Sequence, residues 1–426
     1  MLFVLLLFLL LTAAGAQAQA PIEALALDEA ERIALERNPR IRAAGSNASA
    51  ADAAATGVRA ERSPNLFANI TAVGAHEGSR IGAGAINPSS LISRAAAGVR
   101  LTQLISDFGQ TRNRIHAAEL DADSAEEDVR TVRTAVVLEV RRAYFEALRA
   151  QATVQVSRRT LETRGVQLRQ IQTLAKNELR STLDVSFAQL AVSEAELLVA
   201  TAENQIQQAL ANLEAALGSD LADGVELQAP PESPALEQNA EAYVPEALSN
   251  RPDVAALRLR AQAREYAALG EHHLTRPVIT ADAVMGAIPL REEGVRAAYG
   301  AAGVNVAIPL FNGKRFSSRM AEADARAQAA SEELDALENQ VEQEVVSAWF
   351  EADTAWRQIE LTQRLFDQSA EALRLAQTRY QLGLSSIVEL NQAQLARITA
   401  EIARVTARYD YEVNRAVLLF RIGSPP

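Results

Sequence analysis

The 426-residue chain has 42 lysines and arginines against 54 acidic residues, so its formal net charge is −12. This acidic balance argues against nucleic acid as a partner, because binding to phosphate rewards basic side chains. The lack of cysteine excludes disulfides, zinc–thiolate sites, a thiol nucleophile and a lipidated N-terminal cysteine. We find no nucleophile-elbow sequence, phosphate loop or spaced metal ligands, so we expect no enzyme activity, no bound metal and no cofactor.

Residues 1–20 have the pattern of a secretory signal peptide. An apolar run extends to Leu11, and Ala18-Gln19-Ala20 forms a small-x-small cleavage site. The run is too short to span a bilayer, which takes roughly twenty residues. We see no other apolar run of spanning length, and we therefore expect an exported protein that is not a helical membrane protein.

A first structural repeat is expected over residues 21–218. Apolar residues at three- and four-residue spacing predict a helical segment over 27–63. Strict alternation then predicts a β-hairpin over 66–105, with a loop rich in glycine, serine and asparagine around 82–88. The change of period from helix to strand and back marks this hairpin as a separate unit within the repeat.

Two further helices are expected after the hairpin. Helical spacing continues from 106 to 176, and a helix of about 70 residues would be ~105 Å long. Its stripe of alanine and valine favours coiled-coil packing against other helices. A break leads to a second helix over 184–217, with Gly218 as its C-cap.

The second half of the chain repeats the first. Residues 143–147 (AYFEA) correspond to 348–352 (AWFEA) at a shift of 205, whereas the helices before the hairpins correspond at a shift of 213. The first hairpin is therefore eight residues longer than the second. After a proline-containing connector over 219–242, the second repeat is expected over 243–423, with a helix first. Its later elements are a β-hairpin over 278–310, a long helix over 311–381 and a helix over 387–422.

This pattern predicts a mainly α-helical fold with a small β part. One chain supplies four strands with free edges, which cannot exist in hydrocarbon unless they pair with other chains. We therefore expect internally duplicated helical hairpins that form an α-barrel, and four strands per chain in an oligomeric transmembrane β-barrel. The alternative is a periplasmic coiled-coil scaffold or adaptor-like protein without a pore.

Two stretches resemble the TolC-like outer-membrane efflux protein family. Residues 308–313 (IPLFNG) are similar to the family's strand-to-helix junction, and residues 380–390 (YQLGLSSIVEL) to its helix-hairpin tip, within a resemblance that covers residues 24–423. The resemblance implies a homotrimer with a 12-stranded barrel in the outer membrane and a helical tunnel through the periplasm. It also implies docking to a periplasmic adaptor and an inner-membrane transporter of an efflux or type I secretion system, with passive conduction of small molecules or polypeptide.

The same resemblance points to a gate near the helix-hairpin turns. Asp184 and Glu389 occupy equivalent positions in the two halves, where the family's acids form a constriction that attracts cations. The alternative is that each acid only interacts with its own helix dipole. Two positions depart from the motif: Gln392 replaces a second acid, and Ser385 replaces the arginine that ties the closed state.

Further candidates lie at the tips themselves. Tyr380 is either part of the closed-state latch or the last core aromatic residue of its helix. The pairs Glu178-Leu179 and Gly383-Leu384 mark the exposed tips that would dock the adaptor. Glycine suits a tip because it accepts positive φ, so the tip with Glu178 is the less typical one.

Overall fold

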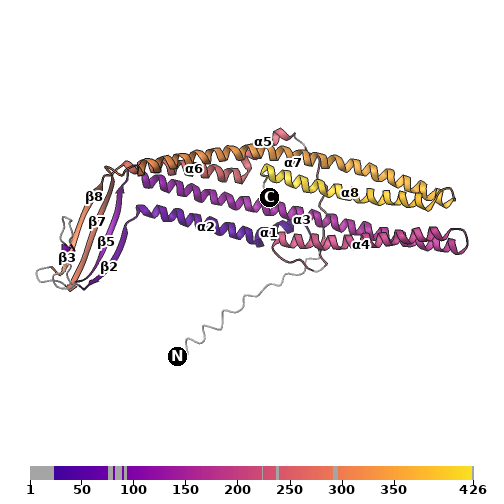
Figure 1. Ribbon diagram of the computed structural model, residues 1–426, viewed down its shortest axis with the longest axis horizontal. Coiled ribbons are helices and arrows are strands. Elements are labelled where there is room, and N and C mark those ends of the chain that lie inside the picture. The colour runs from indigo at the N-terminus through magenta and orange to yellow at the C-terminus, as the bar shows by residue number, and fades with distance from the viewer. Residues whose placement is uncertain are drawn as a thin grey trace, which may run out of the picture.

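The computed structural model describes residues 24–74, 80–81, 89–90, 94–222, 224–236, 239–290 and 296–424. The expected signal peptide (1–20) and the expected hairpin loop around 82–88 lie outside the described residues. The molecule is elongated, with a β-sheet at one end and two helical hairpin tips at the other (Figure 1).

The two halves contain matching elements. The first half has α1 (Leu27–Arg37), α2 (Pro39–Arg59), β2 (Asn65–Val73), β5 (Arg94–Ser106), α3 (Gln110–Lys176) and α4 (Thr182–Leu217). The second has α5 (Ala240–Asn250), α6 (Pro252–His272), β7 (Val278–Leu290), β8 (Ala298–Ala307), α7 (Arg315–Gln381) and α8 (Ile387–Ile422). Corresponding helices have 11, 21, 67 and 36 residues in both halves.

The segment expected as one helix over 27–63 is two helices, so that expectation was wrong. The backbone leaves the helical region at Asn38 (φ −63°, ψ 124°), because the ring of Pro39 disfavours a helical residue before it. The Asn38 side chain accepts a hydrogen bond from the Arg40 amide (2.9 Å) and donates one to the Ala216 carbonyl (2.9 Å). The break therefore caps α2 and ties it to the end of α4.

The connector over 219–242 contains regular structure that we did not expect. Strand β6 (Glu226–Leu227) pairs in parallel with β1 (Ala24–Leu25), and α5 already begins at Ala240. The buried Tyr144 hydroxyl lies 2.7 and 2.6 Å from the carbonyl oxygens of Leu25 and Gln228. Strands of two residues are too short to show periodicity, so only the folded chain reveals them.

The two very long helices change partners along their length. Near the sheet, α2, α3, α6 and α7 pack side by side in that order, whereas toward the tips α3 pairs with α4 and α7 pairs with α8 (Figure 1). The largest core cluster lies where α1, α3 and the end of α4 meet. Buried Val140, Ala143 and Ala147 of α3 are small enough to let the helices approach closely there.

Two glycines hold the ends of α4 and α8 against the short helices. Gly218 and Gly423 have φ of 69° and 77°, a conformation that a side chain disfavours. A Cβ atom on Gly423 would lie 2.8 Å from the Arg251 backbone nitrogen, and one on Gly218 would lie 3.1 Å from the Asn38 Cα atom. Glycine thus serves both the helix end and a close backbone contact.

One described helix, α4, is long and apolar enough to cross a membrane by length and composition, with a mean hydropathy of 1.3 over an 18-residue stretch. The expectation that no such segment exists was therefore wrong. Its alanines at 188, 191 and 195 are buried, and α4 packs along α3 as one arm of the helical hairpin. Because α4 packs against α3, we assign it to the helical hairpin.

Candidate functional site: the sheet and the helical tips

The four long strands form one antiparallel sheet in the order β2–β5–β7–β8. The central pair joins strands from the two halves, with Val99 opposite Met285 and Leu101 opposite Ala283. Among the described residues, the edge strands β2 and β8 have no further partner strand. Because unpaired edges are costly in hydrocarbon, a membrane location requires these edges to pair with further strands.

One face of the sheet is apolar from edge to edge. Directly paired residues of an antiparallel sheet point to the same face. The apolar side chains that the register places on this one include Leu66, Ala68, Ile70, Val99, Leu101, Ala281, Ala283, Met285, Ala302, Val304 and Val306. Ile70, Met285 and Val304 are 88%, 64% and 68% exposed. Gln103, near the helices, is the polar exception on this face. Such a surface is suited to lipid.

The opposite face of the sheet, here called the polar face, holds most of its polar side chains. It carries Asn69, Thr71, Arg100, Thr102, Thr280, Asp282 and Asn305, together with the apolar Phe67, Leu104, Val278 and Val284. The Asp282 carboxylate accepts hydrogen bonds from the hydroxyls of Thr102 (2.9 Å) and Thr280 (3.1 Å). One almost wholly apolar face and one face that holds the charged side chains suit a membrane barrel with a water-filled lumen.

The two helical hairpin tips have the same backbone conformation. Glu178 and Gly383, which correspond at the shift of 205, have φ of 58° and 73°. The next amide in each tip, that of Leu179 or Leu384, donates to a carbonyl five residues earlier, at 2.9 and 2.8 Å. This is a Schellman-type helix end. Leu179 and Leu384 are 68% and 65% exposed, so each tip presents a leucine to its surroundings.

The acidic candidates each start a helix. Asp184 forms a capping box with Ser181, whose backbone nitrogen and hydroxyl lie 3.1 and 3.0 Å from the carboxylate. Glu389 pairs with Arg379 at 3.1 Å, and Gln392 is exposed one turn later. The two acids lie on separate hairpins at the same end of the molecule (Figure 1). Within one chain, both carboxylates are held by local contacts.

Tyr380 links the two hairpins. It is 7% exposed and packs in a cluster that includes Ile171 of α3 and Leu390 of α8. The guanidinium of Arg180, from the other hairpin, lies 4.0 Å from the centre of its ring and donates a hydrogen bond to its carbonyl oxygen. Burial raises the pKa of the Tyr380 phenol, the negative charge of Asp184 raises it further, and Arg180 lowers it. The Tyr380 hydroxyl is buried and has no hydrogen-bond partner among the described residues.

Arg180, which contacts Tyr380, was not among the candidates from the sequence, although a signal was present. The shift of 205 places Arg180 opposite Ser385, the position where the expected arginine is absent. An arginine is therefore found at the equivalent turn of the first hairpin, where the second hairpin has serine. Its contact with Tyr380 spans 200 positions in the sequence, and no local pattern shows it.

A second arginine joins the hairpins farther from the tip. Arg164 of α3 is buried, donates to the amide oxygens of Asn391 (3.3 Å) and Gln394 of α8, and meets no carboxylate in an ion pair among the described residues. Gln394 in turn donates to Gln167 (2.7 Å). Burial lowers the pKa of Arg164, against the influence of Glu194. This amide cluster fixes α8 against α3.

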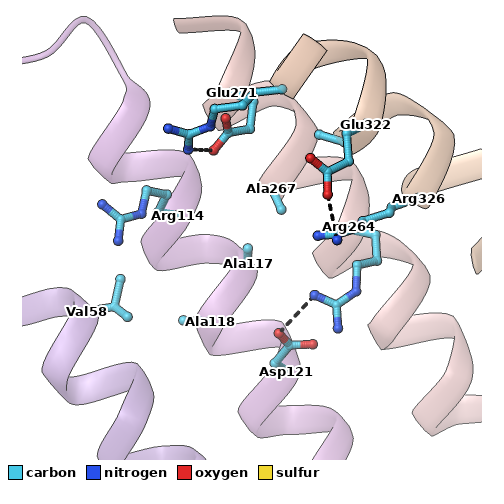
Figure 2. A pocket seen from close by; sticks show the side chains of 12 residues that line it. Val58, Arg114, Ala117, Ala118, Asp121, Arg264, Ala267, Glu271, Glu322 and Arg326 are labelled. Carbon is cyan, nitrogen blue, oxygen red and sulfur yellow. Dashed lines mark hydrogen bonds and ion pairs between the residues drawn. The ribbon is translucent and has the colours of Figure 1, made fainter. Parts of the chain in front are cut away.

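A cavity of about 370 Å³ lies between α2, α3, α6 and α7 near the sheet. Figure 2 shows small side chains such as Ala117 and Ala267 between charged ones. The charges pair across helices, with Arg319 2.6 Å from Glu271 and Arg264 3.9 Å from Asp121. In the part of the chain that is described, no group of three acids or histidines is placed to hold a metal ion. These ion pairs therefore connect neighbouring helices of the bundle, and we assign the cavity a structural role.

The sequence model of the outer membrane efflux protein family matches residues 32–219 and 243–424, which include most of both halves. The chain belongs to this family. Among its relatives, outer membrane protein OprJ of Pseudomonas aeruginosa is 27% identical over 396 residues, which are 92% of this chain and 82% of OprJ. Outer membrane efflux protein BepC of Brucella suis is 24% identical over 76% of this chain and 71% of BepC.

Solved structures of other channels share the fold. The outer membrane protein VceC of Vibrio cholerae matches with a TM-score of 0.80 at 22% identity, over 93% of this chain and 96% of VceC. The transmembrane channel protein CusC matches with a TM-score of 0.82 at 19% identity, over 93% and 92% of the two chains. The expected fold class is confirmed: long duplicated helices for an α-barrel and four strands for a β-barrel. This member of the outer membrane efflux protein family is an outer-membrane efflux channel.

Proposed function

We propose that three copies of the chain form one duct, which a periplasmic adaptor and an inner-membrane transporter engage at the helical tips. The observation that carries the proposal is the four-stranded sheet with two unpaired edges, one apolar face and one polar face. Two copies would give an eight-stranded barrel, whose interior is filled by its own side chains. Three copies give twelve strands, which leave room for a water-filled lumen.

The helical part of the molecule also supports assembly from several copies. Leu183, Leu190 and Leu197 recur every seven residues along α4 and are all exposed in the single chain. A seven-residue leucine repeat is typical of a coiled-coil seam. We infer that this stripe packs against the helical hairpin of a neighbouring copy and closes the tube below the barrel.

The tips are proposed as both gate and docking site. Around a three-fold axis, three copies of Asp184 and Glu389 would bring six carboxylates to the narrow end, where they would attract cations. The exposed Leu179 and Leu384 offer apolar contacts for an adaptor. The contact between Arg180 and Tyr380 holds the two hairpins of one chain together and so opposes opening.

Single-channel conductance in a planar lipid bilayer tests the duct and its acidic ring. The double variant Asp184→Asn with Glu389→Gln keeps side-chain size but removes charge, so we expect channels with reduced cation selectivity. Glu241→Gln, which changes a first-turn acid of α5 far from the tips, should behave as wild type. Channels with unchanged selectivity in the double variant would refute the ring and leave the duct. No channel from the wild-type protein would refute the duct.

Loss of Arg180 should favour the open tip. A cation–π contact contributes about 0.5–2 kcal/mol and a hydrogen bond to a charged group about 1.5–3 kcal/mol, so Arg180→Ala should raise the open fraction roughly tenfold or more in the same bilayer assay. Arg374→Ala removes an exposed pair with Glu371 on α7 and should leave gating unchanged. Equal open fractions in the two variants would show that Arg180 is no latch.

A further inference from the structure

Two glycines and one tyrosine form a three-strand row on the polar face of the sheet. Gly98 of β5 is paired with Gly286 of β7, and Gly286 is paired with Tyr299 of β8. A Cβ atom added to Gly286 would lie 2.5 Å from both the Cζ and the hydroxyl oxygen of Tyr299. One added to Gly98 would overlap the same hydroxyl and lie 3.1 Å from Cζ. The tyrosine ring therefore lies flat across both neighbouring strands.

The row needs glycine for this reason. A Cβ atom essentially never lies within 3.0 Å of another heavy atom, so an alanine at either position would displace the ring. It would also meet backbone, because the Gly286 Cβ would lie 2.5 Å from the Ala97 carbonyl oxygen and the Gly98 Cβ 2.8 Å from that of Met285. Glycine within a strand often marks such a close approach, and an aromatic ring covers the backbone that it leaves bare. By contrast, a Cβ atom on Gly303, on the same face of β8, would meet no atom of the described residues within 4 Å.

The position of the row matters for a channel. Tyr299 is the second residue of β8, at the end of the sheet far from the helices (Figure 1). The face that carries it is the polar one, opposite the apolar surface with Val304 and Met285. In the assembled barrel, three copies of Tyr299 would surround the outer mouth of the lumen.

We infer that Gly98 and Gly286, which have no side chains, let the Tyr299 ring lie flat against the barrel wall. The position of this ring then sets the width of the outer mouth. The inference rests on the proposed trimeric duct and adds a size-determining residue at its exit. With a side chain at either glycine, the ring would have to point into the lumen. Three such rings would narrow the passage for large solutes, while small ions would still pass.

Cysteine labelling in intact cells tests this without depending on the helical gate. The chain has no cysteine, so Gly303→Cys introduces a unique thiol on the lumen face, about 13 Å below Tyr299 at 3.3 Å per residue. Maleimides that cannot cross the outer membrane, one small and others carrying polyethylene glycol chains of increasing length, are added from outside. The labelling rate for each size then reports the width of the mouth.

In the Gly303→Cys background, adding Gly98→Ala should slow labelling by the larger reagents several-fold and leave the small reagent unaffected. Adding Tyr299→Ala to that variant should restore the rate. Gly300→Ala, on the apolar face, is the matched control and should change nothing. Slow labelling that persists without Tyr299 would overturn the inference. It would assign the effect to the backbone, because a Gly98 Cβ would also lie 2.8 Å from the Met285 carbonyl oxygen.

Tyr299→Ala alone keeps the inference testable if Gly98→Ala does not assemble. A ring that already lies flat leaves the mouth open, so its removal should change labelling by the large reagents less than twofold. A large acceleration would show that the ring stands in the mouth, which contradicts the inference. If the small reagent fails to label Gly303→Cys but labels Ala302→Cys, the assignment of the sheet faces fails, and the proposed duct fails with it.

Discussion

Arg251→Ala is expected to lower the free energy of unfolding by about 3 kcal/mol, because breaking a buried ion pair leaves the partner charge uncompensated. The Arg251 side chain is 7% exposed and lies between Asp253 (2.6 Å) and Glu344 (2.8 Å). It joins the start of α6 to α7. Arg421 of α8 also pairs with Glu344 at 2.9 Å, so part of the compensation remains and the loss should lie at the lower end of the range for buried pairs.

The measurement is denaturant unfolding in detergent, followed by the helical circular dichroism signal. Arg258→Ala provides the matched control, because its pair with Glu338 (3.1 Å) also joins α6 to α7 but is exposed. Exposed pairs contribute up to about 1 kcal/mol. If the two variants are equally stable, the buried network contributes nothing beyond an ordinary surface pair.

The same network predicts a dependence on acid. Burial acts to raise the pKa of Glu344, but hydrogen bonds from Arg251 and Gln340 outweigh it, so the pKa lies below its ordinary value. The pKa of Asp253 is lowered in the same way by Arg251. A lowered carboxylate pKa stabilises the fold above the unfolded-state pKa of about 4, and this contribution is lost as the pH falls through the folded-state value. The difference in stability between wild type and Arg251→Ala should therefore shrink below about pH 4.

Val304→Arg is expected to prevent most of the protein from inserting into the outer membrane. Val304 lies near the middle of β8 on the apolar face, and an arginine facing lipid at the bilayer midplane costs about 2–4 kcal/mol in each chain. Three chains in one barrel would each bear this cost. The neighbouring substitution Asn305→Arg places the same charge on the polar face, where water solvates it.

The measurement is the fraction of each variant that folds into lipid vesicles from urea, compared with wild type. Asn305→Arg should fold to a similar extent as wild type, and Val304→Arg should remain largely unfolded or unassembled. Equal folding of the two variants would mean that the sheet does not distinguish lipid from water by its faces. The opposite ranking would place Asn305 toward lipid and invert the assignment of the lumen.

Much of the architecture could be predicted from local patterns. Helical spacing over 106–176 can be recognised from residues that are close in the sequence. The structure has α3 at Gln110–Lys176. The repeat at a shift of 205 is visible for the same reason, since it compares residues without reference to their positions in space. The helix expected over 27–63 failed at Asn38 because the restriction that Pro39 imposes was not applied.

The sequence by itself determined the long helices and strands, their order, the duplication and the family resemblance, because these depend on periodicity and on local motifs. Only the tertiary structure decided which residues meet. The pairing of β5 with β7 joins positions about 180 apart and brings the side chains of all four strands onto one apolar and one polar face. Arg180 meets Tyr380, and Gly98 accommodates Tyr299, through the same long-range packing. Such contacts depend on register and helix crossing, which no local stretch of sequence encodes.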